Sequence, residues 1–173
     1  MNTTVVVRPV EEADAESLGR VHAACWHETY DHLLSQAALS QLRPQRLAAL
    51  WHRFTTQGAE YRQNVVLVDG EIVGFAGSGP TRDGDRPTPH ELFFMYLLEA
   101  NHGSGVGQKL FDSVVDPGPS SLWVAADNPR AHAFYTRNGY VPDGLERNEE
   151  VLGERLHEVR LVRERPCRAT PGA

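Results

Sequence analysis

One stretch in the middle of the chain, residues 91–110, limits the fold more than any other. It reads ELFFMYLLEANHGSGVGQKL, and its opening apolar, aromatic-rich run is typical of a buried strand. Glycines follow at positions 103, 105 and 107, and from Val106 onward apolar residues recur at helical spacing. The stretch therefore predicts a strand, a glycine loop and a helix, in that order.

A loop of this kind is suited to holding an anion. Closely spaced glycines let the backbone approach a ligand with its N–H groups free. The first turn of the helix adds further unpaired N–H donors and a partial positive charge. The sequence therefore predicts an anion site after the strand, and a phosphate group is the anion that we expect there.

Two other phosphate-binding glycine motifs fit the loop poorly. A Walker-type loop places Lys and then Ser or Thr directly after its last glycine, whereas this chain continues Gly107-Gln108-Lys109-Leu110. A dinucleotide fingerprint has the spacing G-x-G-x-x-G in an early βαβ unit, whereas these glycines are spaced G-x-G-x-G past the midpoint of the chain. A tight strand-to-helix turn without a ligand is the simplest alternative.

The remaining elements follow from periodicity and turn residues. We expect helices at 18–26, 35–42, 44–54 and 129–139, strands at 5–7, 65–68, 72–77, 122–125, from 140 and at 156–162, a hairpin turn at 69–70 and a polar loop at 81–89. This order predicts an α/β fold, a single domain over residues 1–163 with a central, mixed, twisted β-sheet flanked by helices on both faces. Residues 164–173 are expected to form a disordered tail.

The composition excludes several classes of protein. A net charge of −6 argues against a nucleic-acid binder, and no apolar run is long enough to span a membrane. The N-terminus lacks a signal-peptide pattern, and Cys25 in an apolar helical stripe and Cys167 in the tail do not suggest a disulfide framework, so we expect a cytoplasmic protein. The eight histidines show no metal-ligand spacing, so no metal is expected. A homodimer is compatible with the sequence, although nothing in it specifies one.

Two motifs in register narrow the hypothesis. The first is His102-Gly103-Ser104-Gly105-Val106-Gly107, which resembles the pattern [QR]-x-x-G-x-[GA] after a strand. The second resembles N-x-x-[AS]-x-x-[FL]-Y-x-x-x-G-[FY], with Asn128, Ala131, Phe134, Tyr135, Gly139 and Tyr140 at the matching positions. On these motifs residues 5–162 resemble the GNAT superfamily of acyl-CoA-dependent N-acetyltransferases. The W-x-x-x-Y of residues 26–30 and the V-P-D-G of residues 141–144 look like a broad bacterial subgroup with unassigned substrates.

The resemblance implies acetyl-CoA as cosubstrate. It places the pyrophosphate on the backbone amides of Gly103, Ser104, Gly105, Val106, Gly107 and Gln108, and the pantetheine arm and thioester on the backbone of Met95, Tyr96 and Leu97. The side chains of these last three residues can equally be plain packing. Asn128 is expected to bond the pantetheine arm, and as the residue before Pro129 it can also cap a helix.

The first motif departs from the family pattern at its start. His102 replaces the usual Gln or Arg, and Ser104 replaces a residue that is often basic. The glycine positions are intact, so the resemblance still implies binding of the pyrophosphate by backbone amides. The missing side-chain charge bears on how tightly the cofactor is held.

The resemblance also assigns the proton transfers. Tyr135 is the expected general acid, because a phenol near the sulfur can protonate the departing thiolate. Glu91 is the expected base for the attacking amine, since it starts the central strand, and a chain of water molecules is the alternative. A second base position used in some relatives, on the strand at 122–125, is occupied by Trp123. The structural alternatives are a core tyrosine and a glutamate at a strand edge.

The acceptor is expected beside the first helix. Trp26, Glu28 and Tyr30 come from this helix and its exit, where Glu28 can hold an ammonium and an aromatic ring can stack on it, although Trp26 also fits the apolar core stripe. The resulting hypothesis is an N-acetyltransferase that moves an acetyl group from acetyl-CoA to a primary amine (a small molecule, an amino acid or a peptide N-terminus) by direct attack. The alternative is a catalytically weak acyl-CoA-binding or regulatory module.

Overall fold

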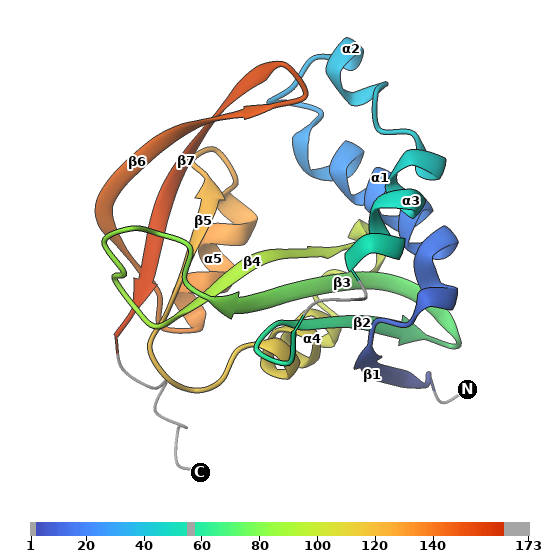
Figure 1. Ribbon diagram of the computed structural model, residues 1–173, viewed down its shortest axis with the longest axis horizontal. Coiled ribbons are helices and arrows are strands. Elements are labelled where there is room, and N and C mark those ends of the chain that lie inside the picture. Colours follow the sequence, from blue (N-terminus) through green and yellow to red (C-terminus); the bar gives the residue numbers. More distant parts are fainter. Residues whose placement is uncertain (1–2, 55–57, 165–173) are drawn as a thin grey trace.

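The computed structural model describes residues 3–54 and 58–164 (Figure 1). Its strands are β1 (Val5–Pro9), β2 (Arg62–Val68), β3 (Glu71–Pro80), β4 (His90–Leu97), β5 (Ser120–Ala125), β6 (Val141–Val151) and β7 (Glu154–Arg163). Its helices are α1 (Ala15–Tyr30), α2 (Gln36–Leu39), α3 (Pro44–Phe54), α4 (Val106–Val114) and α5 (Pro129–Arg137), with short 3₁₀ turns η1 (Glu12–Asp14) and η2 (Glu99–Asn101).

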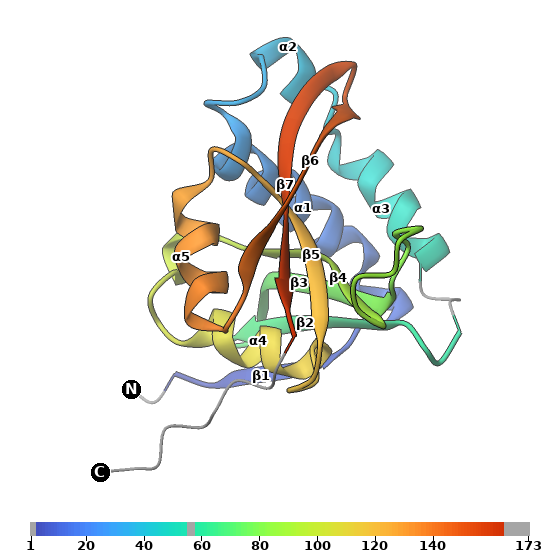
Figure 2. The same cartoon turned by 90° about the vertical axis from the view of Figure 1, so that its left-hand side faces the viewer.

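All seven strands join one mixed sheet. Their order is β1-β2-β3-β4-β5-β7-β6, and β4 with β5 is the parallel pair among antiparallel neighbours. Helices cover both faces of the sheet (Figure 2). This confirms the predicted α/β architecture, in which a hairpin leads into a central strand–helix–strand unit.

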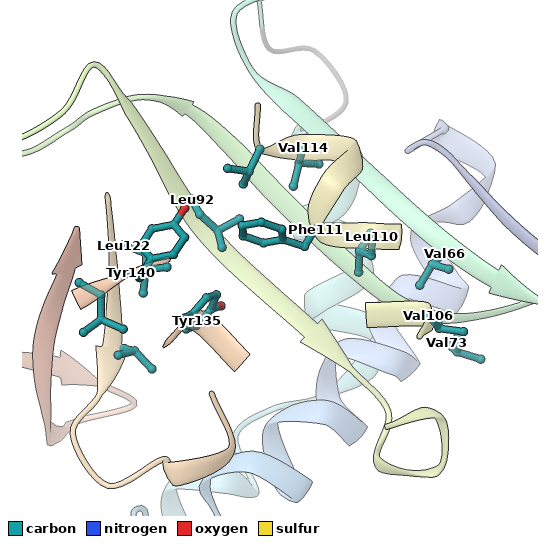
Figure 3. Close-up of a cluster of buried hydrophobic side chains, with 14 residues drawn as sticks. Val66, Val73, Leu92, Val106, Leu110, Phe111, Val114, Leu122, Tyr135 and Tyr140 are labelled. Carbon is teal, nitrogen blue, oxygen red and sulfur yellow. The ribbon is translucent and has the colours of Figure 1, made fainter. Parts of the chain in front are cut away.

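The two sides of the sheet have separate cores. On one side α4 buries Val106, Leu110, Phe111 and Val114 against the strands, and Tyr135 of α5 joins the same cluster (Figure 3). On the other side α1 and α3 pack on the sheet through a smaller cluster: Ala15, Leu18, Trp51, Val65 and Phe75. Neighbours such as Val65 and Val66 point to opposite sides, as the two-residue period of a strand requires.

The sheet opens between β4 and β5. Their parallel pairing is limited to Glu91 with Ser121 and Leu92 with Leu122, after which the two strands diverge (Figure 1). The divergence begins at a β-bulge, because the β3–β4 register passes from Leu92 to Phe94 and leaves Phe93 without an opposite residue. The rest of β4 therefore has a neighbouring strand on one side only.

Several local predictions can be compared with this structure. The Asp69-Gly70 turn is confirmed, with φ of 50° and 87° at its two residues. The helix expected at 35–42 is much shorter, because Ser35 caps it by accepting a hydrogen bond from the N–H of Ala38 and the regular turns end at Leu39. Cys25 is a buried core residue, as expected. Cys167 and the predicted tail beyond residue 164 lie outside the described residues.

Across residues 3–54 and 58–164, no helix combines the length and apolar character that crossing a bilayer requires. Over the same ranges, no group of three or more His, Cys, Asp or Glu side chains is arranged to hold a metal ion.

Candidate active site

A cavity of about 640 Å³ occupies the opening between β4 and β5. Its lining comes from the end of α1, β4, the glycine loop, β5, α5 and β7: residues 28–30, 32, 92–97, 99, 102, 103, 105, 107, 108, 122–125, 128–131, 134, 135, 137 and 158. Tyr135 belongs to the side of the sheet covered by α4 and α5, whereas Tyr30 belongs to the side covered by α1. The cavity therefore connects the two faces through the opening in the sheet.

The glycine loop forms one wall and presents free backbone donors. Gly103 and Gly105 have φ of 73° and 82°, a left-handed conformation that glycine adopts without steric cost, and Gly105 caps α4. Within the described ranges no acceptor meets the backbone N–H of Gly103, Ser104, Gly105, Gly107 or Gln108. A Cβ at Gly103 or Gly105 would meet no atom within 4 Å, so these donors border open space. Such a row of amides at a helix start fits an anion.

A cation from α5 reaches the same loop. The ring of His102 lies 2.8 Å from the carbonyl oxygen of Leu97 through Nε2, and because a carbonyl only accepts, Nε2 carries the proton. Nδ1 is then an acceptor, and Arg130 Nη1 donates to it. Arg130 also lies 3.7 Å from the Glu99 carboxylate. The His102 ring thus orients a guanidinium beside the glycine loop, which the sequence motif did not reveal.

The free edge of β4 forms a second wall. Leu98 donates its N–H to Val73 of β3, so by alternation along an antiparallel pair Tyr96 also faces β3. Met95 and Leu97 then direct their N–H and C=O groups into the opening, where the Leu97 carbonyl already accepts from a histidine ring. The Met95 backbone therefore presents both groups to the cavity.

Tyr96 contributes through its side chain to a different contact. Its hydroxyl lies 2.9 Å from the hydroxyl of Tyr30, and burial raises its pKa well above the usual value. The two rings belong to an aromatic cluster that also includes Trp26, whose ring centroid is 4.9 Å from that of Tyr30. Tyr30 lines the cavity, whereas Trp26 stands behind it and does not. Trp26 is therefore placed as packing for the wall.

Two predicted residues, the N-cap of α5 and a residue within the helix, line the cavity. Asn128 accepts a hydrogen bond from the N–H of Ala131 at 3.1 Å and caps α5, while its side-chain nitrogen has no partner within the described ranges. Tyr135 is 8% exposed, and its hydroxyl has no hydrogen-bond partner among the described residues. Burial raises the pKa of Tyr135, with smaller contributions from Tyr140 and Tyr30. The phenol therefore stays protonated at physiological pH.

Glu91 lies apart from this group. It is 2% exposed, does not line the cavity, and sits at the closed end of the β4–β5 pair. Arg82 binds both of its carboxylate oxygens, with its backbone N–H at 2.8 Å from Oε2 and Nη2 at 2.7 Å from Oε1. The side chain that we expected to act on an acceptor is thus turned to a structural contact, because β4 alternates and residue 91 points to the loop at 81–89.

The α1 side of the cavity carries two carboxylates from different elements. Glu28 lies at the exposed end of α1 and accepts the N–H of Glu99 at 2.8 Å. Glu158 comes from β7, which the sequence analysis did not connect with the site. Leu156, Glu158 and Arg160 share one face of β7 because side chains alternate along a strand, and the pairing of Glu158 with Ala125 shows which face it is.

The opened mixed sheet, the free amides at the start of α4 and the protonated Tyr135 thus lie together at one cavity. The chain belongs to the acetyltransferase (GNAT) family, whose model matches residues 22–140. No curated protein sequence matches the chain.

Solved structures share the fold over nearly the whole chain. PaiA N-acetyltransferase from Thermoplasma acidophilum, in complex with coenzyme A, has a TM-score of 0.66 at 16% identity and covers 93% of this chain and 99% of its own. A GCN5-related N-acetyltransferase from Rhodopseudomonas palustris has a TM-score of 0.68 at 18% identity, with 95% and 98% covered. YncA from Salmonella typhimurium, with its cofactor acetyl-CoA, has a TM-score of 0.66 at 18% identity, with 98% and 99% covered.

Proposed function

We propose that the protein transfers an acetyl group from acetyl-CoA to a primary amine. The observation that carries this proposal is a single cavity bordered by the free amides of the glycine loop, the open edge of β4 and the protonated Tyr135. These three features match the three parts of the cosubstrate, which are a pyrophosphate, a pantetheine arm with amide groups and a thioester. Small amines, amino acids and peptide N-termini are the acceptor candidates.

The cofactor-binding roles follow from the free donors. The amides from Gly103 to Gln108 would hold the pyrophosphate, since the loop offers them in open space at the positive end of α4. The backbone of Met95 would bond the pantetheine arm or the thioester carbonyl, where a fixed N–H stabilises negative charge. The free side-chain nitrogen of Asn128 would bond the same arm while its oxygen caps α5.

Protonation of the thiolate and attack by the amine require few residues besides those that bind the cofactor. Tyr135 would protonate the departing thiolate, for which its raised pKa keeps it in the protonated form. An acyl-enzyme is not expected at Cys25, because this thiol is 1% exposed and burial raises its pKa to about 12, with Glu28 adding to the shift. Direct attack of the amine on the thioester is therefore the simpler route.

Thiol release from acetyl-CoA across a panel of primary amines tests the proposed function. We expect saturable, amine-dependent release together with an acetylated acceptor in the mass spectrum. Tight coenzyme A binding with no turnover on any amine would instead favour the acyl-CoA-binding module.

Arg130→Gln tests whether Arg130 supplies the positive charge that the first motif lacks at His102 and so helps to bind the pyrophosphate. We expect the dissociation constant of coenzyme A to rise about tenfold, the effect of one charge-assisted hydrogen bond worth about 1.4 kcal/mol. Isothermal titration calorimetry measures this dissociation constant. Added salt should weaken the binding of coenzyme A to the wild-type protein more than to the variant. Arg20→Gln is the matched control, since Arg20 is exposed on α1 and does not line the cavity. Equal affinities for Arg130→Gln and wild type would remove Arg130 from phosphate binding.

A further inference from the structure

The carboxylate of Glu158 is the sheltered acid group of the cavity. Three carboxylates line the space, and Glu99 and Glu28 are exposed at its rim. The side chain of Glu158 is only 13% exposed. It lies directly opposite Ala125 of β5, on the face of the sheet that packs against the end of α1. Glu158 therefore lines the cavity from the α1 side of the sheet.

Glu158 keeps one oxygen available. Its Oε2 accepts a hydrogen bond from Arg147 Nε at 2.7 Å, whereas Oε1 has no hydrogen-bond partner within residues 3–54 and 58–164. The negative charge also acts on the Tyr30 and Tyr96 hydroxyls, whose pKa values are raised mainly by burial and further by this carboxylate. Glu158 therefore shares the cavity with the edge of β4, where the thioester is expected.

Neighbouring groups hold this carboxylate in place. The Arg147 guanidinium stacks 4.3 Å above the ring of Trp123, and the indole N–H of Trp123 donates to the carboxylate of Asp83 at 3.1 Å. Arg160 binds Asp83 as well, which fixes the loop at 81–89 against β7. A chain of contacts from β5, β6 and the loop thus orients Glu158 before any ligand arrives, as a binding group requires.

We propose that Glu158 binds the ammonium group of the acceptor and takes its proton, which makes the preferred acceptor a protonated alkylamine. This inference rests on the proposed function. A free carboxylate oxygen in a sheltered cavity attracts an ammonium strongly, because the surrounding water that would screen the pair is reduced. Glu91 offers no such oxygen, since Arg82 occupies both of its own.

Every proton is accounted for in the proposed acetyl transfer. The ammonium passes one proton to Glu158, and the neutral nitrogen then forms the C–N bond with the thioester carbon. The C–S bond breaks, and the thiolate takes a proton from Tyr135. The nitrogen loses its second proton as the amide forms, and through solvent this proton restores Tyr135. The proton on Glu158 passes to solvent, so the net products are the amide, the free thiol and one proton.

Glu158→Gln separates this role from a structural one. The amide oxygen of glutamine can still accept from Arg147, so the fold should be kept, and thermal unfolding checks this. For the best alkylamine of the panel, we expect kcat/KM to fall by about 100-fold or more, the scale of a lost general base. For an aniline, which is already neutral at pH 7, the fall should stay below about threefold, since no ammonium has to be bound or deprotonated.

Two parallel variants complete the test. Glu146→Gln is the control, because Glu146 is a neighbouring carboxylate of β6 that is exposed and does not line the cavity, and it should leave both rates unchanged. Glu91→Gln should leave the ratio of the alkylamine and aniline rates as in wild type. An equal loss on both amines in Glu158→Gln, or a selective alkylamine loss in Glu91→Gln alone, would overturn the assignment. Wild-type inactivity on every amine would instead contradict the proposed function itself.

Discussion

Gly105→Asp is expected to abolish binding of coenzyme A. Gly105 has φ of 82° at the start of α4, and a side chain there would extend into the open space that borders the free amides. An aspartate would place a negative charge where the pyrophosphate is expected, so repulsion adds to the loss of space. We expect the dissociation constant to rise by more than about 100-fold, that is by over about 2.7 kcal/mol, as measured by calorimetry.

The same substitution elsewhere supplies the control. Gly70 has φ of 87° in the β2–β3 turn, and a Cβ there also meets nothing within 4 Å. Gly70→Asp therefore carries the same backbone strain and the same charge without touching the cavity. It should bind coenzyme A like wild type, and the two variants should unfold at similar temperatures. Unchanged affinity in Gly105→Asp would place the pyrophosphate elsewhere.

Tyr135→Phe is expected to lower turnover while the cofactor still binds. Removal of the hydroxyl deletes the proposed proton donor, so kcat should fall by about 100-fold or more. The ring remains packed, with centroids 5.4 Å from Phe134 and 5.8 Å from Tyr140. The hydroxyl has no partner among the described residues, so stability and coenzyme A affinity should change little. Single-turnover thiol release and calorimetry on the same sample separate the two effects.

Tyr140→Phe is the matched variant in the same aromatic cluster. The Tyr140 hydroxyl lies 2.5 Å from Ser120 Oγ, is buried, and does not line the cavity. Its loss should therefore lower the unfolding temperature and leave kcat near the wild-type value. A Tyr135→Phe protein with normal turnover would remove this phenol from the chemistry.

Local sequence signals predicted the parts of the site that depend on neighbouring residues. The glycine loop, the start of α4 and the cap at Asn128 all follow from turn and capping chemistry within a few positions. The placement of Tyr135 in a core cluster at the cavity also follows, because helical spacing puts it on the face that carries Ala131. The order of strands and helices was predictable for the same reason.

Strand pairings and side-chain contacts between residues far apart in the chain could not be predicted from local sequence signals. That β4 and β5 part after two residue pairs depends on a bulge at Phe93, which no local pattern announces. The pairing of Glu91 with Arg82 and the orientation of Arg130 by His102 join side chains whose distance in space cannot be read from spacing. The position of Glu158 in the cavity was not predicted, because it depends on which face of β7 meets the end of α1.

The most direct test of a coenzyme A binding site between the glycine loop and β4 is an amide NMR titration with coenzyme A. The chain of 19.2 kDa is small enough for assigned amide spectra. The largest shifts should fall on Gly103, Gly105, Gly107 and Gln108, with Met95 on the facing strand, and Gly105→Asp should lose them. Saturable binding that shifts residues away from this cavity and leaves the glycine-loop amides unchanged would contradict the proposed site.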